Sequence, residues 1–159
     1  MNVMTKEQHR QAPLKLDTIR EVSARERNSD SLQDLPPRFW EDAQEYVDIL
    51  TMRLEDATCD VTGAAELPAE VKRLREERKS ALEVLESLAD RRKAKVVKRA
   101  TLSAKGLPVE TDAMTDREQS LFETARGEFE SASLVPSLDD IQDQPAPSAD
   151  EAVEQEVTE

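Results

Sequence analysis

The residue types that carry most enzymatic chemistry are scarce in this sequence. His9 is the only histidine and Cys59 the only cysteine, so the chain cannot assemble a metal cage from His and Cys ligands. Gly63, Gly106 and Gly127 are isolated from one another, and none precedes Lys-Ser or Lys-Thr as in a phosphate-binding loop. The Gly-x-Ser-x-Gly nucleophile elbow is also absent. We therefore expect a protein that is not an enzyme and that needs no metal ion or cofactor.

A run of basic residues between 91 and 99 is the main charged motif. It holds six cations and no anion, although the whole chain has a formal net charge of −13. On helical spacing Arg91, Lys95 and Lys98 share one side, and Arg92 and Arg99 share another. One interpretation is a solvated helix face near a helix C-terminus; the other is a docking surface for an acidic partner or for phosphates. Because no aromatic side chain is interleaved for stacking on bases, the docking interpretation favours a protein partner.

Large apolar side chains provide a second set of candidates. Phe39 and Trp40 directly follow Leu35-Pro36-Pro37-Arg38, and they are interpreted either as core residues of a proline-initiated helix or as anchors for another subunit. Leu85 and Phe122 lie within later apolar stripes. The suspected partner interface thus comprises Arg91, Arg92, Lys95, Lys98, Arg99, Phe39, Trp40, Leu85 and Phe122.

Composition predicts the kind of fold that must position these residues. Aromatic residues make up 3% of the 159 residues, so few large side chains are available for a thick core. A sheet protein with many tight turns would also need more than three glycines. We predict an all-α, antiparallel helical bundle of about four main helices that includes one long helix.

Apolar periodicity indicates where the first two helices lie. The first begins at Leu16, with Asp17 as a candidate N-cap, and ends near Asn28. Pro36-Pro37 is expected to open the second, which continues for about five turns, because proline is tolerated in a first helical turn.

The later helices have clearer boundaries. The third is predicted from Pro68 to about Ala104, with Gly106 as its stop signal. Such a helix would be ~55 Å long, which is more than a domain of this size covers unaided, so part of its face is expected to meet a partner. Thr115 and Glu118 have the spacing of a capping box and predict the start of the fourth helix.

The two ends of the sequence differ in composition from its middle. Residues 1–13 are expected to be a disordered lead-in, residues 14–134 a helical domain, and residues 135–159 a disordered acidic tail that contains proline. From residue 136 onward there are eight acidic residues and no basic one. The tail is interpreted as a spacer, as a segment that recruits a basic partner, or as a shield for the chain's own basic segment.

Charge and hydropathy also bear on location. A strongly acidic chain argues against a simple DNA-binding domain and is explained by the acidic tail, by adaptation to high salt, or by both. The first six residues lack the apolar core of a signal peptide, and no apolar run approaches the ~20 residues that span a bilayer. With one cysteine, a reducing compartment is expected, so we predict a soluble cytoplasmic protein with no membrane contact.

Several stretches, in this order, resemble the helical domain of the archaeal GINS complex, in the subunit type that carries its helical domain first. The matching stretches are Leu16 to Val22, Asp30 to Gln33, Leu35 to Trp40, Arg91 to Ala100 and Met114 to Phe122. The resemblance covers about residues 14–132, and it depends on the order and spacing of these stretches.

The resemblance implies a DNA replication factor that performs no chemistry itself. GINS subunits form a tetrameric scaffold, commonly two copies each of two related subunits, which joins the MCM helicase to a RecJ-like or Cdc-type factor and activates the helicase at the fork. Direct binding to nucleic acid is expected to be weak or absent. Subunits of this type usually continue into a small β domain, which we expect to be missing here because the residues after 133 have tail composition. The acidic composition points to a haloarchaeal source.

Two other classes of protein compete with this interpretation. A coiled-coil or helical-bundle adaptor unrelated to replication would use the long helix, although the apolar stripe breaks at Arg78 and Arg92. A helical nucleic-acid-binding protein would be retained on heparin or single-stranded DNA with a steep dependence on salt.

Overall fold

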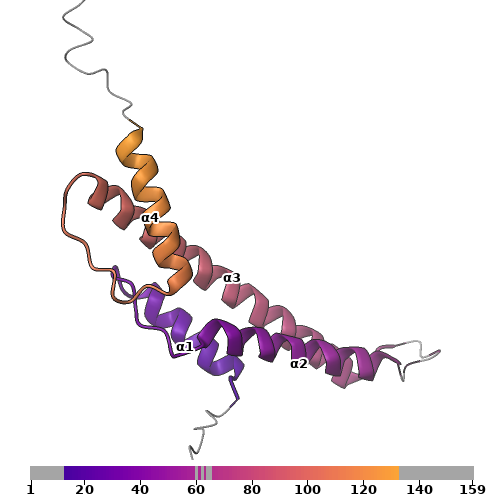
Figure 1. Ribbon diagram of the computed structural model, residues 1–159. Helices are drawn as coiled ribbons and strands as arrows, with labels where there is room; N and C mark the ends of the chain where they lie inside the picture. The colour runs from indigo at the N-terminus through magenta and orange to yellow at the C-terminus, as the bar shows by residue number, and fades with distance from the viewer. Residues whose placement is uncertain (1–12, 60, 62, 64–65, 133–159) are drawn as a thin grey trace, which may run out of the picture.

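The computed structural model describes residues 13–59, 61, 63 and 66–132, and within these ranges the protein is helical without strands (Figure 1). Its elements are α1 (Leu16–Arg27), α2 (Phe39–Cys59), α3 (Ala69–Ala104) and α4 (Asp116–Ser131). The predicted all-α class with one long helix is confirmed. The predicted acidic tail, and the lead-in except for residue 13, lie outside the described residues.

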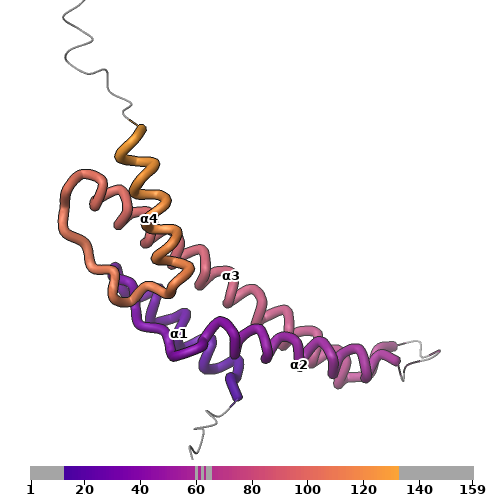
Figure 2. Tube along the Cα trace, viewed as in Figure 1, coloured from indigo at the N-terminus to yellow at the C-terminus, as the bar shows by residue number. Residues whose placement is uncertain are grey.

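The long helix α3 is the axis of the molecule, and each of the other helices packs against it (Figure 2). With 36 residues, α3 is ~54 Å long at 1.5 Å per residue. Helix α2 accompanies its N-terminal half, α4 its C-terminal half, and α1 lies near its middle (Figure 1). The result is an elongated arrangement in which no single helix covers the whole of α3.

The directions of the helices differ in part from the predicted antiparallel bundle. Helix α2 is antiparallel to α3, as the pairing of Tyr46 with Glu77 and the packing of Phe39 near Leu88 require. Helix α4 instead runs in the same direction as α3, and so does α1 (Figure 2). The connection over residues 105–115 makes this possible, because it carries the chain back along α3 before α4 begins (Figure 1).

Helix α1 begins at Leu16 as predicted, but its predicted N-cap was wrong, and so was the predicted start of α2. The N-cap of α1 is Lys15, whose side chain makes no capping bond, whereas Asp17 lies in the first turn, where a negative charge favours the helix dipole. Helix α2 begins at Phe39 rather than at the prolines. The amide of Phe39 donates to the carbonyl of Pro36 at 3.1 Å, and Arg38 has a φ of 57°. The prolines thus belong to a turn before α2, and positive φ at its third residue is typical of a type II turn.

The end of α3 and the start of α4 are those that the sequence predicts. The amide of Gly106 donates to the carbonyl of Ser103 at 2.9 Å, and that of Leu107 to Leu102 at 3.1 Å. With Gly106 at a φ of 78°, these bonds form a Schellman motif. At α4, Thr115 and Glu118 form both bonds of the predicted capping box.

Two apolar clusters hold the helices on α3. The first joins Val22, Phe39 and Leu88, and the second joins Leu32, Val96, Ala100 and Phe122. A separate row of buried side chains follows the paired helices α2 and α3 toward the loop between them; it includes Val47, Leu50, Val71, Leu74 and Ala81. Within the described ranges, no helix is both long and apolar enough to cross a membrane.

Candidate protein-interaction surface

The basic segment of α3 divides between the interior and the surface. Arg92 lies on the buried stripe of α3, between Leu88 and Val96, and its side chain has no exposed area. Lys95 is largely covered, with 16% of its side chain exposed. Arg91 and Lys98 are exposed, as is Lys93, while Arg99 is half-buried. The whole segment was interpreted as a solvated helix face or as a docking surface, but part of its charge points into the protein.

The guanidinium of Arg92 uses all five of its N–H donors. Nε and Nη2 donate to the two carboxylate oxygens of Glu118 at 2.7 and 2.8 Å, which is a bidentate pair. Nη1 donates to Glu26 Oε2 at 2.8 Å and to the carbonyl of Gln33 at 2.7 Å. The remaining Nη2 proton is donated to the carbonyl of Ala113 at 2.9 Å. One side chain thus ties α1, α4, the α1–α2 connection and the α3–α4 connection to α3.

Lys95 completes the network on the side of α1. Its ammonium donates to a carboxylate oxygen of Glu26, to the backbone carbonyl of Glu26 at 2.7 Å and to that of Ser31 at 3.0 Å. Glu26 is itself 1% exposed, and its Oε2 also accepts the amide of Gln33 at 3.2 Å. Two cations and two carboxylates form the network, so its formal charges cancel.

The pKa values of the bidentate pair show that both partners are held in their charged forms. Burial by itself would lower the pKa of Arg92, but the hydrogen bonds and charges of Glu118 and Glu26 outweigh it and raise that pKa. Burial would likewise raise the pKa of Glu118. The bonds from Arg92 and from the amide of Thr115 outweigh that effect, so the pKa of Glu118 lies below its ordinary value.

Arg92 and Lys95 are therefore structural residues in this fold, not surface groups that a partner could contact. The sequence contained a usable indication of this. Arg92 falls on the same face of α3 as Leu88 and Val96, and Glu26 falls four residues after Val22 on the apolar face of α1. Opposite charges on the apolar stripes of two helices indicate a buried pair, because an isolated charge there would be too costly.

The cations that remain accessible form a narrower feature. Arg91, Lys98 and Lys105 are exposed and follow one another at seven-residue spacing, which places them along one side of α3. We call these three residues the basic strip. Lys105 was not among the residues predicted from the sequence, because it lies beyond the basic segment. Lys93 is on another side of the helix and pairs with Asp90 at 3.6 Å.

The apolar candidates belong mostly to the chain's own core. Phe39 and Phe122 are each 3% exposed, so they are not available to a partner in this fold. Trp40 is half-buried and packs edge-on against Phe39, with 5.2 Å between ring centroids and an interplanar angle of 77°. Leu85 is half-buried beside the first cluster. The interpretation of the two aromatic residues at 39 and 40 as core residues is supported.

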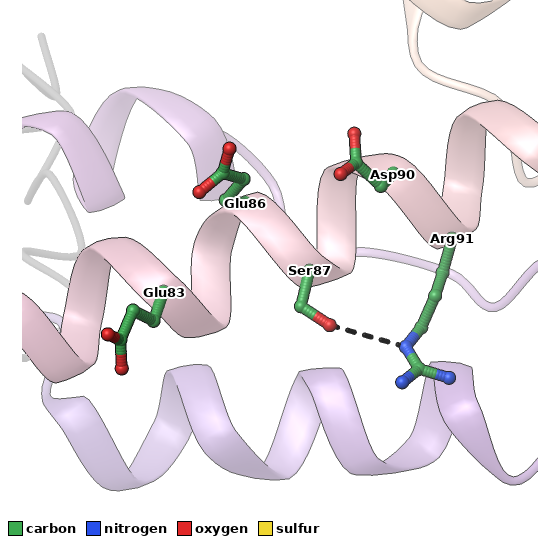
Figure 3. A pocket seen from close by; sticks show the side chains of 5 residues that line it. All are labelled: Glu83, Glu86, Ser87, Asp90 and Arg91. Atoms are coloured by element: carbon green, nitrogen blue, oxygen red, sulfur yellow. Dashed lines mark hydrogen bonds between the residues drawn. The ribbon is translucent and has the colours of Figure 1, made fainter.

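A shallow depression lies on α3. Glu83, Glu86, Ser87, Asp90 and Arg91 line it. Arg91 Nε donates to Ser87 Oγ at 3.4 Å, while the carboxylates of Glu86 and Asp90 point to the opposite side of the helix (Figure 3). In the part of the chain that the structure describes, no group of three or more His, Cys, Asp and Glu side chains is placed to hold a metal ion.

Comparison of the chain with protein-family models, with curated proteins and with solved structures finds no match.

Proposed function

We propose that this chain is a non-catalytic scaffold subunit that assembles with other helical chains as part of a GINS-type replication complex. Its partners would be a second GINS subunit, in a tetramer, together with the MCM helicase and a RecJ-like or Cdc-type factor. The resemblance described above supplies the identity of these partners, and the uncovered apolar surface of the helices supports a role in assembly.

The observation that carries this proposal is the apolar face of α4. Phe122 and Phe129 are two helical turns apart and share one face of the helix. Phe122 is buried against Val96 and Ala100, but Phe129 is 43% exposed. The last turns of α4 reach the outer end of the molecule (Figure 2). An apolar stripe that continues beyond its own core is typical of a helix that is completed by another chain.

Other helices also leave apolar side chains uncovered. Met52 on α2 is 63% exposed, and Leu82 on α3 is 42% exposed. Exposed apolar residues are common when they are scattered, so each one alone indicates little. Together with Phe129 they place apolar contacts on three helices of a slender molecule, which favours a subunit with more than one neighbour.

The test is reconstitution from purified proteins. The chain is mixed with the second GINS subunit and with MCM from the same organism, and the mass of the complex is measured by light scattering after size exclusion. We expect a heterotetramer and a faster ATP-dependent unwinding by MCM. A complex that fails to form at micromolar concentrations of both subunits would contradict the proposal.

A matched pair of variants locates the interface. Phe129→Glu should weaken assembly, because it places a charge where an apolar contact is expected. Glu128→Ala changes the adjacent, exposed position and should leave assembly intact. Equal effects of the two substitutions would show that the end of α4 is not the contact.

A second candidate is a helical adaptor unrelated to replication, which the paired helices α2 and α3 favour. They form a two-helix arm, in which Arg78 Nε donates to Thr51 Oγ1 at 2.9 Å and Tyr46 packs beside Glu77. An adaptor of this kind would bind a helical partner through the arm. The reconstitution separates the two functions, since an adaptor would neither bind MCM nor change its rate of unwinding.

A further inference from the structure

We propose that the acidic segment 133–159 of this chain docks on the basic strip of its own α3. The strip consists of Arg91, Lys98 and Lys105, all exposed. Helix α3 carries no acidic residue from Arg91 to its end. Within the described residues, no carboxylate lies within 4.0 Å of the charged nitrogens of these three side chains. Among the residues that the structure describes, the strip is thus a row of uncompensated cations, on a strongly acidic protein.

The segment has the charge that the strip requires. It contains eight of the 35 acidic residues of the chain and none of the 22 basic ones. Its carboxylates are distributed from Asp139 to Glu159, so several can face the strip at once. Single exposed ion pairs are weak, but a row of cations that meets a run of anions adds several such contacts along one side of a helix.

The segment also starts close enough to the basic strip to reach it. It follows Ala132, at the end of α4, and α4 packs along the same half of α3 that carries the strip. From Arg91 to Lys105 the strip is ~21 Å long at 1.5 Å per residue. An unconstrained chain with as many residues as segment 133–159 has an end-to-end distance on the order of 30 Å. This distance exceeds the length of the strip, so the carboxylates reach the strip without a change in the helices.

The covalent connection gives this contact an advantage over an external acidic chain. A tethered segment acts at an effective concentration near the millimolar range. An acidic partner that uses the strip must therefore displace the segment first, so that 133–159 sets the threshold for binding there. The contact is a property of the isolated chain, and it can fail while the proposed scaffold function holds.

Zero-length carbodiimide cross-linking of the full chain tests the proposal, because it joins lysine amines to carboxylates that are already in contact. Trypsin cuts last at Arg126 and releases the segment as a single peptide, which mass spectrometry identifies together with the lysine that it carries. We expect links to Lys98 and Lys105. Lys72 and Lys79, exposed on the other half of α3, are internal controls with the same chemistry and should give several-fold lower yields.

The second measurement is the change in cross-link yield when salt is added or when charged residues are substituted. Raising NaCl from about 0.05 to about 1 M shortens the Debye length to about 3 Å and should abolish most of the links. Arg91→Glu with Arg99→Glu leaves both target lysines in place and should lower their yields several-fold. Arg73→Glu with Arg75→Glu, an equal change of charge on the distant half of α3, should not. Circular dichroism of each variant verifies that the helices are intact.

Three results would overturn the proposal. Links from 133–159 distributed equally over Lys72, Lys79, Lys98 and Lys105 would show random encounters. A yield that rises with protein concentration would show contact between copies instead of within one chain. An absence of links to the strip at low salt in the unmodified chain would exclude the docked arrangement, even if the variants failed to fold.

Discussion

Arg92 and Glu118 form a bidentate ion pair between α3 and α4, with nitrogen–oxygen distances of 2.7 and 2.8 Å. The same Glu118 carboxylate accepts the amide of Thr115 at 2.9 Å, which is the return bond of the capping box. One carboxylate therefore both starts α4 and places its first turn on α3. This dual bonding couples the start of α4 to its position on α3. Sliding α4 along α3 would break the ion pair, and turning Glu118 to keep the pair would break the cap.

Removing Arg92 should be far more destabilising than removing its neighbour. Arg92→Ala leaves the buried carboxylates of Glu26 and Glu118 without their main partner, and breaking a buried pair in this way costs about 3–5 kcal/mol. Arg91→Ala removes an exposed side chain and should leave the unfolding midpoint nearly unchanged. Urea unfolding followed by far-UV circular dichroism measures both. Similar midpoints for the two variants would mean that Arg92 is not held as described.

Acid should weaken the fold through Glu118. Because the folded protein lowers the pKa of Glu118 below 4.5, its contribution to stability is complete above the unfolded pKa. It is lost as the pH falls through the folded value. The hydrogen bonds and charges of Glu118 and Glu26 raise the pKa of Arg92 further above its already high ordinary value, so Arg92 stays charged throughout and adds no dependence on pH in acid. The free energy of unfolding should therefore fall as the pH drops below 4.5.

Two substitutions on α4 separate this effect from general acid denaturation. Glu118→Gln should be less stable than the unmodified chain at neutral pH and should flatten the fall in acid. Glu123→Gln changes a half-exposed carboxylate of the same helix, which pairs only at the surface with Arg126, and should leave the slope in place. Unfolding midpoints of both variants and of the unmodified chain, measured between pH 3 and 7, distinguish the two effects. An unchanged slope in Glu118→Gln would rule out the lowered pKa.

Local sequence patterns predicted most helices well, because the interactions that start, end and space a helix involve residues close in sequence. The Schellman motif at Gly106 and the capping box at Thr115 depend on residues within one turn, and the long apolar stripe of α3 depends on helical spacing. The start of α2 was missed by two residues because a turn, not a helix, accommodates Pro37, with Arg38 at positive φ. Nothing in the spacing of the residues distinguished these two uses of proline.

The arrangement of the helices and the interior charges could not be predicted in the same way. Glu26 and Arg92 are 66 residues apart in sequence, and Glu118 is 26 residues beyond Arg92. Only the tertiary fold brings them together, so Arg92 was grouped with surface cations. The parallel direction of α4 could not be predicted either. The connection between α3 and α4 is long enough to return along α3, so α4 could run in either direction relative to α3.

Tyr46 should ionise at unusually high pH. Its hydroxyl donates to Glu77 Oε1 at 2.7 Å, and burial together with this carboxylate raises its pKa to about 12. Absorbance near 295 nm follows this directly, because Tyr46 is the only tyrosine. We expect a midpoint near 12 in buffer and near the ordinary value of 10.0 in denaturant. The contribution of Tyr46 to stability is therefore complete below 10.0 and disappears as the pH rises through about 12.

Glu77→Gln tests the cause of that shift. It removes the negative charge while keeping an acceptor, so the midpoint should move toward 10.0 but stay above it, since burial is the larger cause. Glu76→Gln, at an exposed position next to it, is the control and should leave the titration unchanged. A midpoint near 10.0 in the folded, unmodified chain would mean that the bond between α2 and α3 is absent.

The same substitution at two glycines should change stability in opposite directions. Gly106 has a φ of 78° and ends α3, whereas Gly127 lies inside α4; at both positions an added Cβ would meet nothing within 4 Å. An added methyl group would therefore clash with no neighbouring atom, and the change in stability depends only on the backbone conformation. Gly106→Ala should cost about 1 kcal/mol, because left-handed backbone is unfavourable for alanine. Gly127→Ala should stabilise by roughly 0.5–1 kcal/mol, because glycine is a poor helix former. Paired urea titrations measure the two signs, and destabilisation by Gly127→Ala would contradict a continuous α4.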